Sequence, residues 1–180
     1  LKADGQHDPR MSADEAKDKG ITKLDGALVN INGLNVIGIG DPFERLSLEQ
    51  TEQQIGDQSR IQVGSQLANV ACQEKEINIA VANQPSVIEE TAQRGCAELV
   101  IAGGFETEYR EVPAQNGNLI AYYLARSSGG ATYSNKADLA TLNEPQVSMD
   151  LTTFTFDEAS GKPLYFEVVT VLPYGSVKIS

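Results

Sequence analysis

One strand–turn–helix unit constrains the fold of this chain more than any other feature. The run LNVIGI at 34–39 leads through the turn Gly40-Asp41-Pro42 into a segment whose apolar residues recur at helical spacing. Because almost every position of 34–39 is apolar, the sequence predicts a strand that is buried on both faces of a sheet. A buried strand followed by an amphipathic helix is typical of layered α/β domains.

The helix of this unit is expected over 47–73. Ser47 and Gln50 have the spacing of a capping box, in which each side chain binds a backbone N–H of the first turn. A break at Gly56 is the alternative, and the helix would then begin again at Asp57 or Ser59.

The strand at 34–39 has an apolar neighbour immediately before it. The run at 27–31 is joined to it by Asn32-Gly33, which predicts a tight hairpin. One strand with a kink is the alternative.

A second helix is expected between two further apolar strands. Ser86 and Glu89 have capping-box spacing after Pro85, and Arg94-Gly95 is a typical helix stop. The strands on either side are expected at 77–82 and 98–102. The first half of the chain therefore predicts the order β-α-β-α-β.

The second half favours antiparallel strands. A strand is expected at 119–125 and a loop at 127–145, followed by a long hairpin with strands at 147–156 and 164–172. The whole pattern predicts an α/β or α+β fold. Its mixed sheet would have about five to six strands, with two helices on one face.

The length of 180 residues fits one domain. Residues 21–180 are expected as a single globular α/β domain. Residues 1–20 are expected as a flexible polar tail, or as a tail with a short helix over 13–19 capped by Ser12 and Glu15. Because the chain begins at Leu1, any signal peptide or lipid-attachment cysteine is expected upstream.

The charge of the chain disfavours two classes of partner. The net charge is −11, whereas nucleic acids and anionic lipids are bound by clustered Lys and Arg. No apolar run approaches the ~20 residues that span a bilayer. A soluble surface without nucleic-acid binding or a transmembrane span is therefore expected.

The two cysteines have no metal-site spacing. Cys72 and Cys96 stand apart from each other, and the single histidine, His7, lies in the polar tail, so no metal site is expected. In an oxidising compartment the two thiols would form a disulfide that closes a loop of about 25 residues, worth about 3 kcal/mol. Two buried free thiols are the alternative.

The turn after 34–39 does not have the residues of a phosphate site. GIGDPF lacks the third glycine of a dinucleotide fingerprint, Asp41 and Glu44 would repel a phosphate, and Pro42 has no amide N–H. No serine lies in a nucleophile elbow. The acids Glu106 and Glu108 could pair on one strand face as in a hydrolase, but a solvated face explains them better. We therefore expect no catalytic residues and no cofactor.

Tyrosines in the expected strands form a candidate ligand or partner surface. These are Tyr109, Tyr122 and Tyr123, together with Tyr133 in the 127–145 loop, which would act as a lid. Packing of the same rings in the core is the alternative.

Several stretches resemble small envelope lipoproteins of Gram-negative bacteria. DQSRIQVGSQLANVA and GGFETEYREV, with NLIAYYLAR after it, resemble the flagellar-assembly and twenty-kilodalton outer-membrane lipoprotein group. AELVIAGGFETEY and the closing VSMDLTTFTFDEASGKPLYFEVVT resemble the curli-secretion lipoprotein and the N-terminal domain of the periplasmic TolB protein. The resemblance covers about 34–171. It implies an envelope location, a role in assembly and no catalytic residues.

These observations predict a non-enzymatic accessory or assembly domain of a bacterial envelope structure. It would be periplasmic or anchored to the outer membrane, and would act on a protein partner or by self-association. The alternative is a small-ligand-binding module that uses the tyrosine-bearing sheet and the 127–145 loop.

Overall fold

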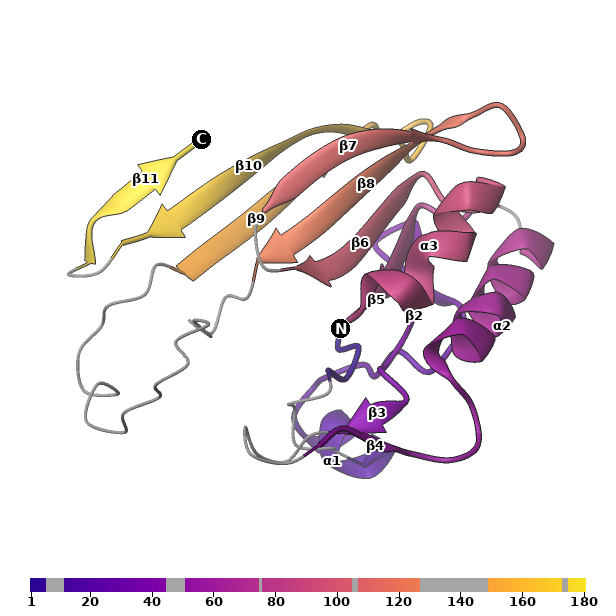
Figure 1. The fold of residues 1–180 in the computed structure, drawn as a ribbon. Coiled ribbons are helices and arrows are strands. Elements are labelled where there is room, and N and C mark those ends of the chain that lie inside the picture. The colour runs from indigo at the N-terminus through magenta and orange to yellow at the C-terminus, as the bar shows by residue number, and fades with distance from the viewer. Residues whose placement is uncertain (6–11, 45–50, 75, 105–106, 127–148, 173–174) are drawn as a thin grey trace.

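The computed structural model describes residues 1–5, 12–44, 51–74, 76–104, 107–126, 149–172 and 175–180 (Figure 1). The helices are α1 (Ala13–Asp18), α2 (Arg60–Gln73) and α3 (Pro85–Arg94). The strands are β1 (Val29–Ile31), β2 (Leu34–Ile39), β3 (Phe43–Glu44), β4 (Gln53–Gln54), β5 (Ile79–Ala82), β6 (Leu99–Gly104), β7 (Glu108–Pro113), β8 (Leu119–Arg126), β9 (Met149–Phe156), β10 (Pro163–Val171) and β11 (Val177–Ile179).

The central layer is a six-stranded mixed sheet with the order β1-β2-β5-β6-β8-β7. Strands β2, β5, β6 and β8 are parallel, and the edge strands β1 and β7 are antiparallel to their neighbours. Helices α2 and α3 pack together over one face of this sheet (Figure 1). The predicted α+β fold, with a mixed sheet and two helices on one face, is confirmed.

The opposite face of the central sheet carries a second β-layer. It is a three-stranded antiparallel sheet with the order β11-β10-β9, and a separate two-stranded ribbon is formed by β3 and β4. Phe154, Phe156 and Phe166 of the second layer pack on Leu99 and Tyr123 of the central sheet. The molecule therefore has three layers, namely helices, central sheet and second sheet (Figure 1).

Two local predictions of turn chemistry are confirmed. Asn32 and Gly33 have φ values of 49° and 89°, as the turn of a two-residue hairpin between β1 and β2 requires. Gly95 ends α3 in the left-handed conformation.

The helix predicted over 47–73 begins later than residue 47. Residues 51–59 are not helical, and β4 lies within them. Helix α2 begins at Arg60, where Ser59 and Gln62 form a capping box, so the alternative start at Ser59 is correct. The Ser47–Gln50 box lies outside the described residues.

The capping box predicted for the next helix is wrong. Its N-cap is Gln84, which makes no side-chain cap bond, and Pro85 occupies the first turn. Proline suits that position because its missing N–H would have no partner within the helix. The predicted box at Ser86 and Glu89 begins two residues too late.

The first residues of the chain are held more firmly than a flexible tail would be. Lys2 forms a parallel bridge with Lys23, and the side chain of Asp4 is almost completely buried. The short helix α1 has the expected capping box of Ser12 and Glu15. The division into a tail and one domain stays a prediction.

The predicted disulfide is present. Cys72 near the end of α2 is bonded to Cys96, just before β6, across 24 positions of sequence. It ties the helical layer to the central sheet. None of the described helices has the length and apolar character needed to cross a bilayer.

Candidate functional site

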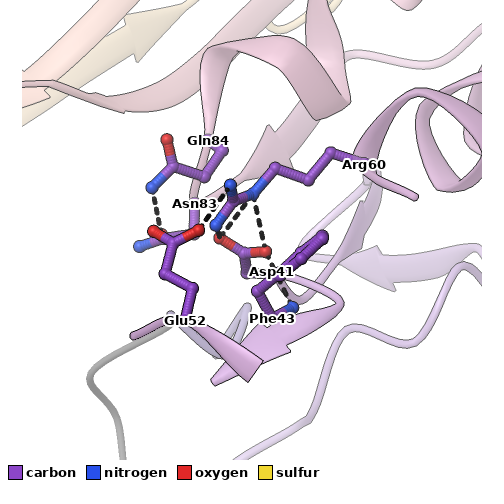
Figure 2. Close-up of polar contacts among 6 residues, drawn as sticks. All are labelled: Asp41, Phe43, Glu52, Arg60, Asn83 and Gln84. Atoms are coloured by element: carbon purple, nitrogen blue, oxygen red, sulfur yellow. Dashed lines mark hydrogen bonds and ion pairs between the residues drawn. The ribbon is translucent and has the colours of Figure 1, made fainter. Parts of the chain in front are cut away.

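The first candidate is the carboxyl edge of the parallel strands, which is where α/β sheets usually bind ligands. Strand β2 ends at Ile39 and is followed by Gly40 and Asp41, and β5 is followed by Asn83 and Gln84. Arg60 in the first turn of α2 reaches the same edge, as Figure 2 shows. We call this region the carboxyl edge.

An arginine fork binds a buried carboxylate at the carboxyl edge. Nε of Arg60 donates to Oδ1 of Asp41 at 2.9 Å, and Nη2 donates to Oδ2 at 2.9 Å (Figure 2). The Asp41 side chain is 0% exposed and that of Arg60 is 22% exposed. Asp41 Oδ1 also accepts from the backbone N–H of Phe43 at 3.0 Å. The carboxylate therefore fixes both the turn after β2 and the first turn of α2.

A second acid and an aromatic ring complete the surroundings of Arg60. Nη1 donates to Oε2 of Glu52 at 3.0 Å, and the guanidinium lies 4.4 Å from the centre of the Phe43 ring. Burial lowers the pKa of Arg60, but hydrogen bonds and charge from Asp41 and Glu52 outweigh it and raise the pKa above its usual value. The cation is thus held by groups of the same chain.

The N-terminal segment covers the other side of this edge. The carbonyl of Asp4 accepts from the N–H of Asp41 at 2.8 Å, and a Cβ on Gly40 would come within 3.2 Å of Asp4. The Asp4 carboxylate pairs with Lys23 at 2.8 Å and Lys2 at 3.3 Å. Burial raises its pKa, but the two lysines together lower it below the usual value.

The remaining polar groups of the carboxyl edge also bind one another. Gln84 Nε2 donates to Oδ1 of Asn83 at 3.4 Å, and the carbonyl of Asn83 accepts from the N–H of Gly103 at 2.9 Å. The described polar groups of the carboxyl edge therefore make contacts within the chain. This agrees with the interpretation of GIGDPF as a structural turn.

The second candidate is the solvent-facing side of the three-stranded sheet. In β9, the even-numbered residues point toward the central sheet: Asp150 and Thr152 make hydrogen bonds there, and Phe154 packs on Tyr123. Because strand side chains alternate, Leu151 points away from it. The register then places Val169 of β10 beside Leu151, and Ile179 of β11 beside Val169.

A second apolar row lies next to the first. Val171 of β10 pairs with Val177 of β11 on the same side of the sheet. We call the five side chains of these two rows the outer face: Leu151, Val169, Val171, Val177 and Ile179. Leu151, Val177 and Ile179 are 62%, 58% and 66% exposed.

The tyrosines predicted as a binding surface do not share one face. Tyr122 and Tyr123 are neighbours in β8, so they point to opposite sides, and they are only 3% and 1% exposed. Tyr122 packs under the helices and Tyr123 against the second sheet. Tyr109 is 43% exposed and packs on Phe166 at 5.0 Å between ring centres. The alternative of core packing is therefore correct for Tyr122 and Tyr123.

Other sequence predictions fall outside the described residues. Tyr133 and the 127–145 loop are not described, and neither is Glu106 of the possible acid pair. Glu108 is exposed and lies 3.7 Å from Arg110. A cavity of about 30 Å³ lies between Tyr109 and Phe154, which is room for about one water molecule.

Comparison with known proteins gives a distant structural match. No family model and no curated protein matches the chain. The solved structure of a 5'-nucleotidase precursor from Thermus thermophilus is similar at a TM-score of 0.44 and 14% identity, over 89% of this chain and 35% of that one. This chain thus spans about a third of that protein's length. A likeness of this strength carries no activity over to it.

The comparison corrects the functional prediction. A non-enzymatic envelope accessory or assembly domain was expected, and the solved protein that matches is an enzyme precursor instead. The resemblance to envelope lipoproteins and the envelope location stay predictions, since none of these comparisons bears on them. A proposal about function must therefore be based on the geometry of the chain itself.

Proposed function

We propose that this chain binds a partner protein through its outer face. The observation that carries the proposal is the exposure of Leu151, Val177 and Ile179, which are each more than half exposed and lie in adjacent rows of one sheet. Scattered apolar side chains are normal on protein surfaces, but a continuous apolar patch is typical of an interaction site.

The two sides of the three-stranded sheet differ in what covers them. On the inner side, Val168 is 8% exposed and Phe166 packs on the central sheet. On the outer face, no described element packs over Leu151 or Ile179. Covering this apolar area would contribute roughly 25 cal/mol per Å² removed from water.

The charge of the chain favours a different protein over a second copy as the occupant. With a net charge of −11, two copies would repel each other, whereas a neutral or basic partner would not. The five side chains of the outer face are uncharged, and Glu167, two residues before Val169, is a charged residue on the same side of β10.

The disulfide supports a second, independent proposal about location. A bonded pair at Cys72 and Cys96 persists most readily in an oxidising compartment, and the periplasm is one such compartment. A thiol assay of the protein taken directly from its native cells, with rapid alkylation, tests this. Two alkylated cysteines would contradict it.

Site-specific cross-linking tests the outer face. A photo-reactive amino acid at position 151 is compared with the same amino acid at position 119, because Leu119 is 60% exposed and lies on β8, outside the outer face. We expect a defined cross-linked protein from position 151 and none in common with position 119. The same products from both positions would contradict the proposal, and so would a product consisting of two copies of this chain.

The cross-linked protein is then purified and its affinity for the chain is measured. Leu151→Asp places a charge in the outer face and is expected to weaken binding at least about tenfold, as loss of an apolar anchor does. Leu119→Asp is the matched control and leaves the affinity unchanged. Equal affinities for the two variants would overturn the proposal.

A further inference from the structure

Strand β11 is the edge of the three-stranded sheet, and its hydrogen bonds alternate. The backbone groups of Ser180 exchange two bonds with Val168, at 2.9 and 3.0 Å, and the carbonyl of Ser176 accepts from Leu172 at 2.7 Å. In an antiparallel pair, bonded and non-bonded positions alternate along the strand. Residues 176, 178 and 180 therefore face β10 with their backbone groups.

The backbone groups of the residues in between point the other way. The N–H and C=O groups of Val177 and Ile179 are directed to the edge of β11 that is away from β10. Among the described residues, no strand pairs with that edge. The side chains of the same two residues belong to the outer face. One partner segment could thus use the free backbone groups and the apolar side chains together.

We propose that the partner adds an extended strand to the edge of β11, and this rests on the proposed function of the outer face. An added strand would receive and donate backbone hydrogen bonds at Val177 and Ile179, as in other complexes formed by strand addition. Its outward side chains would extend the two apolar rows.

The residue between these two positions selects the charge of one side chain in the added strand. Lys178 is exposed on the inner side of β11, opposite Thr170 of β10. The nearest carboxylate in that row, Asp150, is already bound by Thr170 at 2.7 Å and Thr107 at 3.2 Å. No ion pair of Lys178 occurs within the described part of the chain.

A strand added beside β11 would place one side chain directly opposite Lys178. Opposite charges in such a cross-strand pair stabilise it, and like charges destabilise it. The fitting segment is therefore extended and has an acidic residue between two apolar ones. A second copy of β11, paired antiparallel about its centre, would bring Lys178 against Lys178, so self-pairing is disfavoured.

A pair of short peptides tests the charge preference with the full chain. The probes are fluorescent peptides with the sequence Ser-Thr-Val-Glu-Val-Thr-Ser or with Lys in place of Glu, and binding is followed by anisotropy. We expect the Glu peptide to bind about two- to tenfold more tightly. Lys178→Glu should invert the preference. Equal binding of the two peptides to both proteins would overturn the assignment of the acidic residue.

Backbone bonding at β11 is tested separately. Ile179→Pro removes an N–H that points to the free edge and keeps the bonds of residues 178 and 180 to β10. Ile179→Ala keeps the N–H but has less apolar carbon than proline. Strand addition predicts weaker binding of the Glu peptide to the Pro variant than to the Ala variant. Contact through side chains alone predicts that the Pro variant binds the Glu peptide at least as tightly as the Ala variant does.

A modified probe gives the same test without altering the protein. N-methylation of alternate residues of the Glu peptide removes the N–H groups of one edge and keeps the side chains. Methylation of one of the two alternating sets should weaken binding about tenfold, and unchanged binding of both methylated peptides would exclude strand addition. Affinity for the cross-linked partner separates the two proposals, because β10 and β11 lie between Leu151 and a peptide at the free edge. If Leu151→Asp leaves this affinity unchanged while Ile179→Pro weakens it, the outer face is wrong and the edge stands. If Leu151→Asp weakens binding and the proline variant does not, the proposal of the outer face stands and that of strand addition is wrong.

Discussion

The carboxyl edge and the outer face differ in whether their side chains find partners within the chain. At the carboxyl edge, Asp41 and Arg60 are charged, but each is paired within the chain. On the outer face, Leu151 and Ile179 are apolar, and no described element covers them. At a position that favours ligands in other α/β sheets, the described charged groups are paired within the chain, and a sheet surface that is usually solvated carries apolar side chains.

This difference shows that the position of a motif in a fold is weaker support for a function than whether its side chains are paired or exposed. The carboxyl edge uses its polar groups to join β2, α2 and the N-terminal segment. Changes there should therefore act on stability. Changes on the outer face should act on binding and leave stability almost unaltered.

The largest effect is expected from Arg60→Ala. It leaves the buried carboxylate of Asp41 without its guanidinium, so the free energy of unfolding should fall by about 3 kcal/mol or more. Urea denaturation followed by circular dichroism measures this. Glu108→Ala is the control, because the Arg110–Glu108 pair is more than half exposed on both sides and should contribute less than about 1 kcal/mol.

Removal of the disulfide should have the next largest effect. Replacing Cys72 and Cys96 together by serine opens a loop that spans 24 positions, and the unfolding free energy should drop by about 3 kcal/mol in the chain-entropy model. Because the bond joins α2 to the start of β6, binding of the Glu peptide at the edge of β11 should persist in the variant below its unfolding temperature. Loss of binding while the chain is still folded would show that the two regions are coupled.

Acid should act on the carboxyl edge through Asp4. Its pKa is lowered in the folded chain from 3.8, so its ion pairs stabilise the fold above that pH, and this stabilisation is lost as the pH falls below it. Asp4→Asn should reduce the unfolding free energy by about 1.5 kcal/mol at pH 7 and flatten its decline in acid. A pH series of denaturation curves for both proteins decides this. If the unfolding free energies of the two proteins fall in parallel as the pH is lowered, Asp4 does not cause the loss of stability in acid.

The smallest effect on stability is expected on the outer face. Leu151→Asp replaces an exposed side chain, and the unfolding free energy should stay within about 1 kcal/mol of the parent, which is the range of strand propensities. A larger loss would mean that Leu151 is covered in the native protein, which would remove the contrast between the two regions.

The sequence predicts the main layers because its periodicity is local information. Strand-length apolar runs and helical spacing identify β2, β5, β6 and the helices, and Asn32-Gly33 identifies the hairpin. The start of α2 is ambiguous, because Ser47 and Ser59 both begin capping boxes in the sequence. A three-residue strand such as β11 is too short to leave a periodic signal.

The candidate sites depend on contacts that the sequence does not encode locally. Asp41 and Arg60 are 19 positions apart, and no spacing rule predicts their fork. In β9, alternation separates Leu151 from Phe154 but does not say which side is buried, and packing of Phe154 on Tyr123 decides it. One signal was present: Tyr122 and Tyr123 are adjacent in a strand, so they could not share a face.

Binding of the purified cross-linked partner to the Leu151→Asp and Leu119→Asp variants tests the central claim most directly. The two leucines are exposed to almost the same extent, 62% and 60%, so the comparison isolates position from chemistry. The outer face predicts that Leu151→Asp weakens binding at least about tenfold while Leu119→Asp binds as the parent does. Equal affinities of the two variants, with both proteins folded, would contradict it.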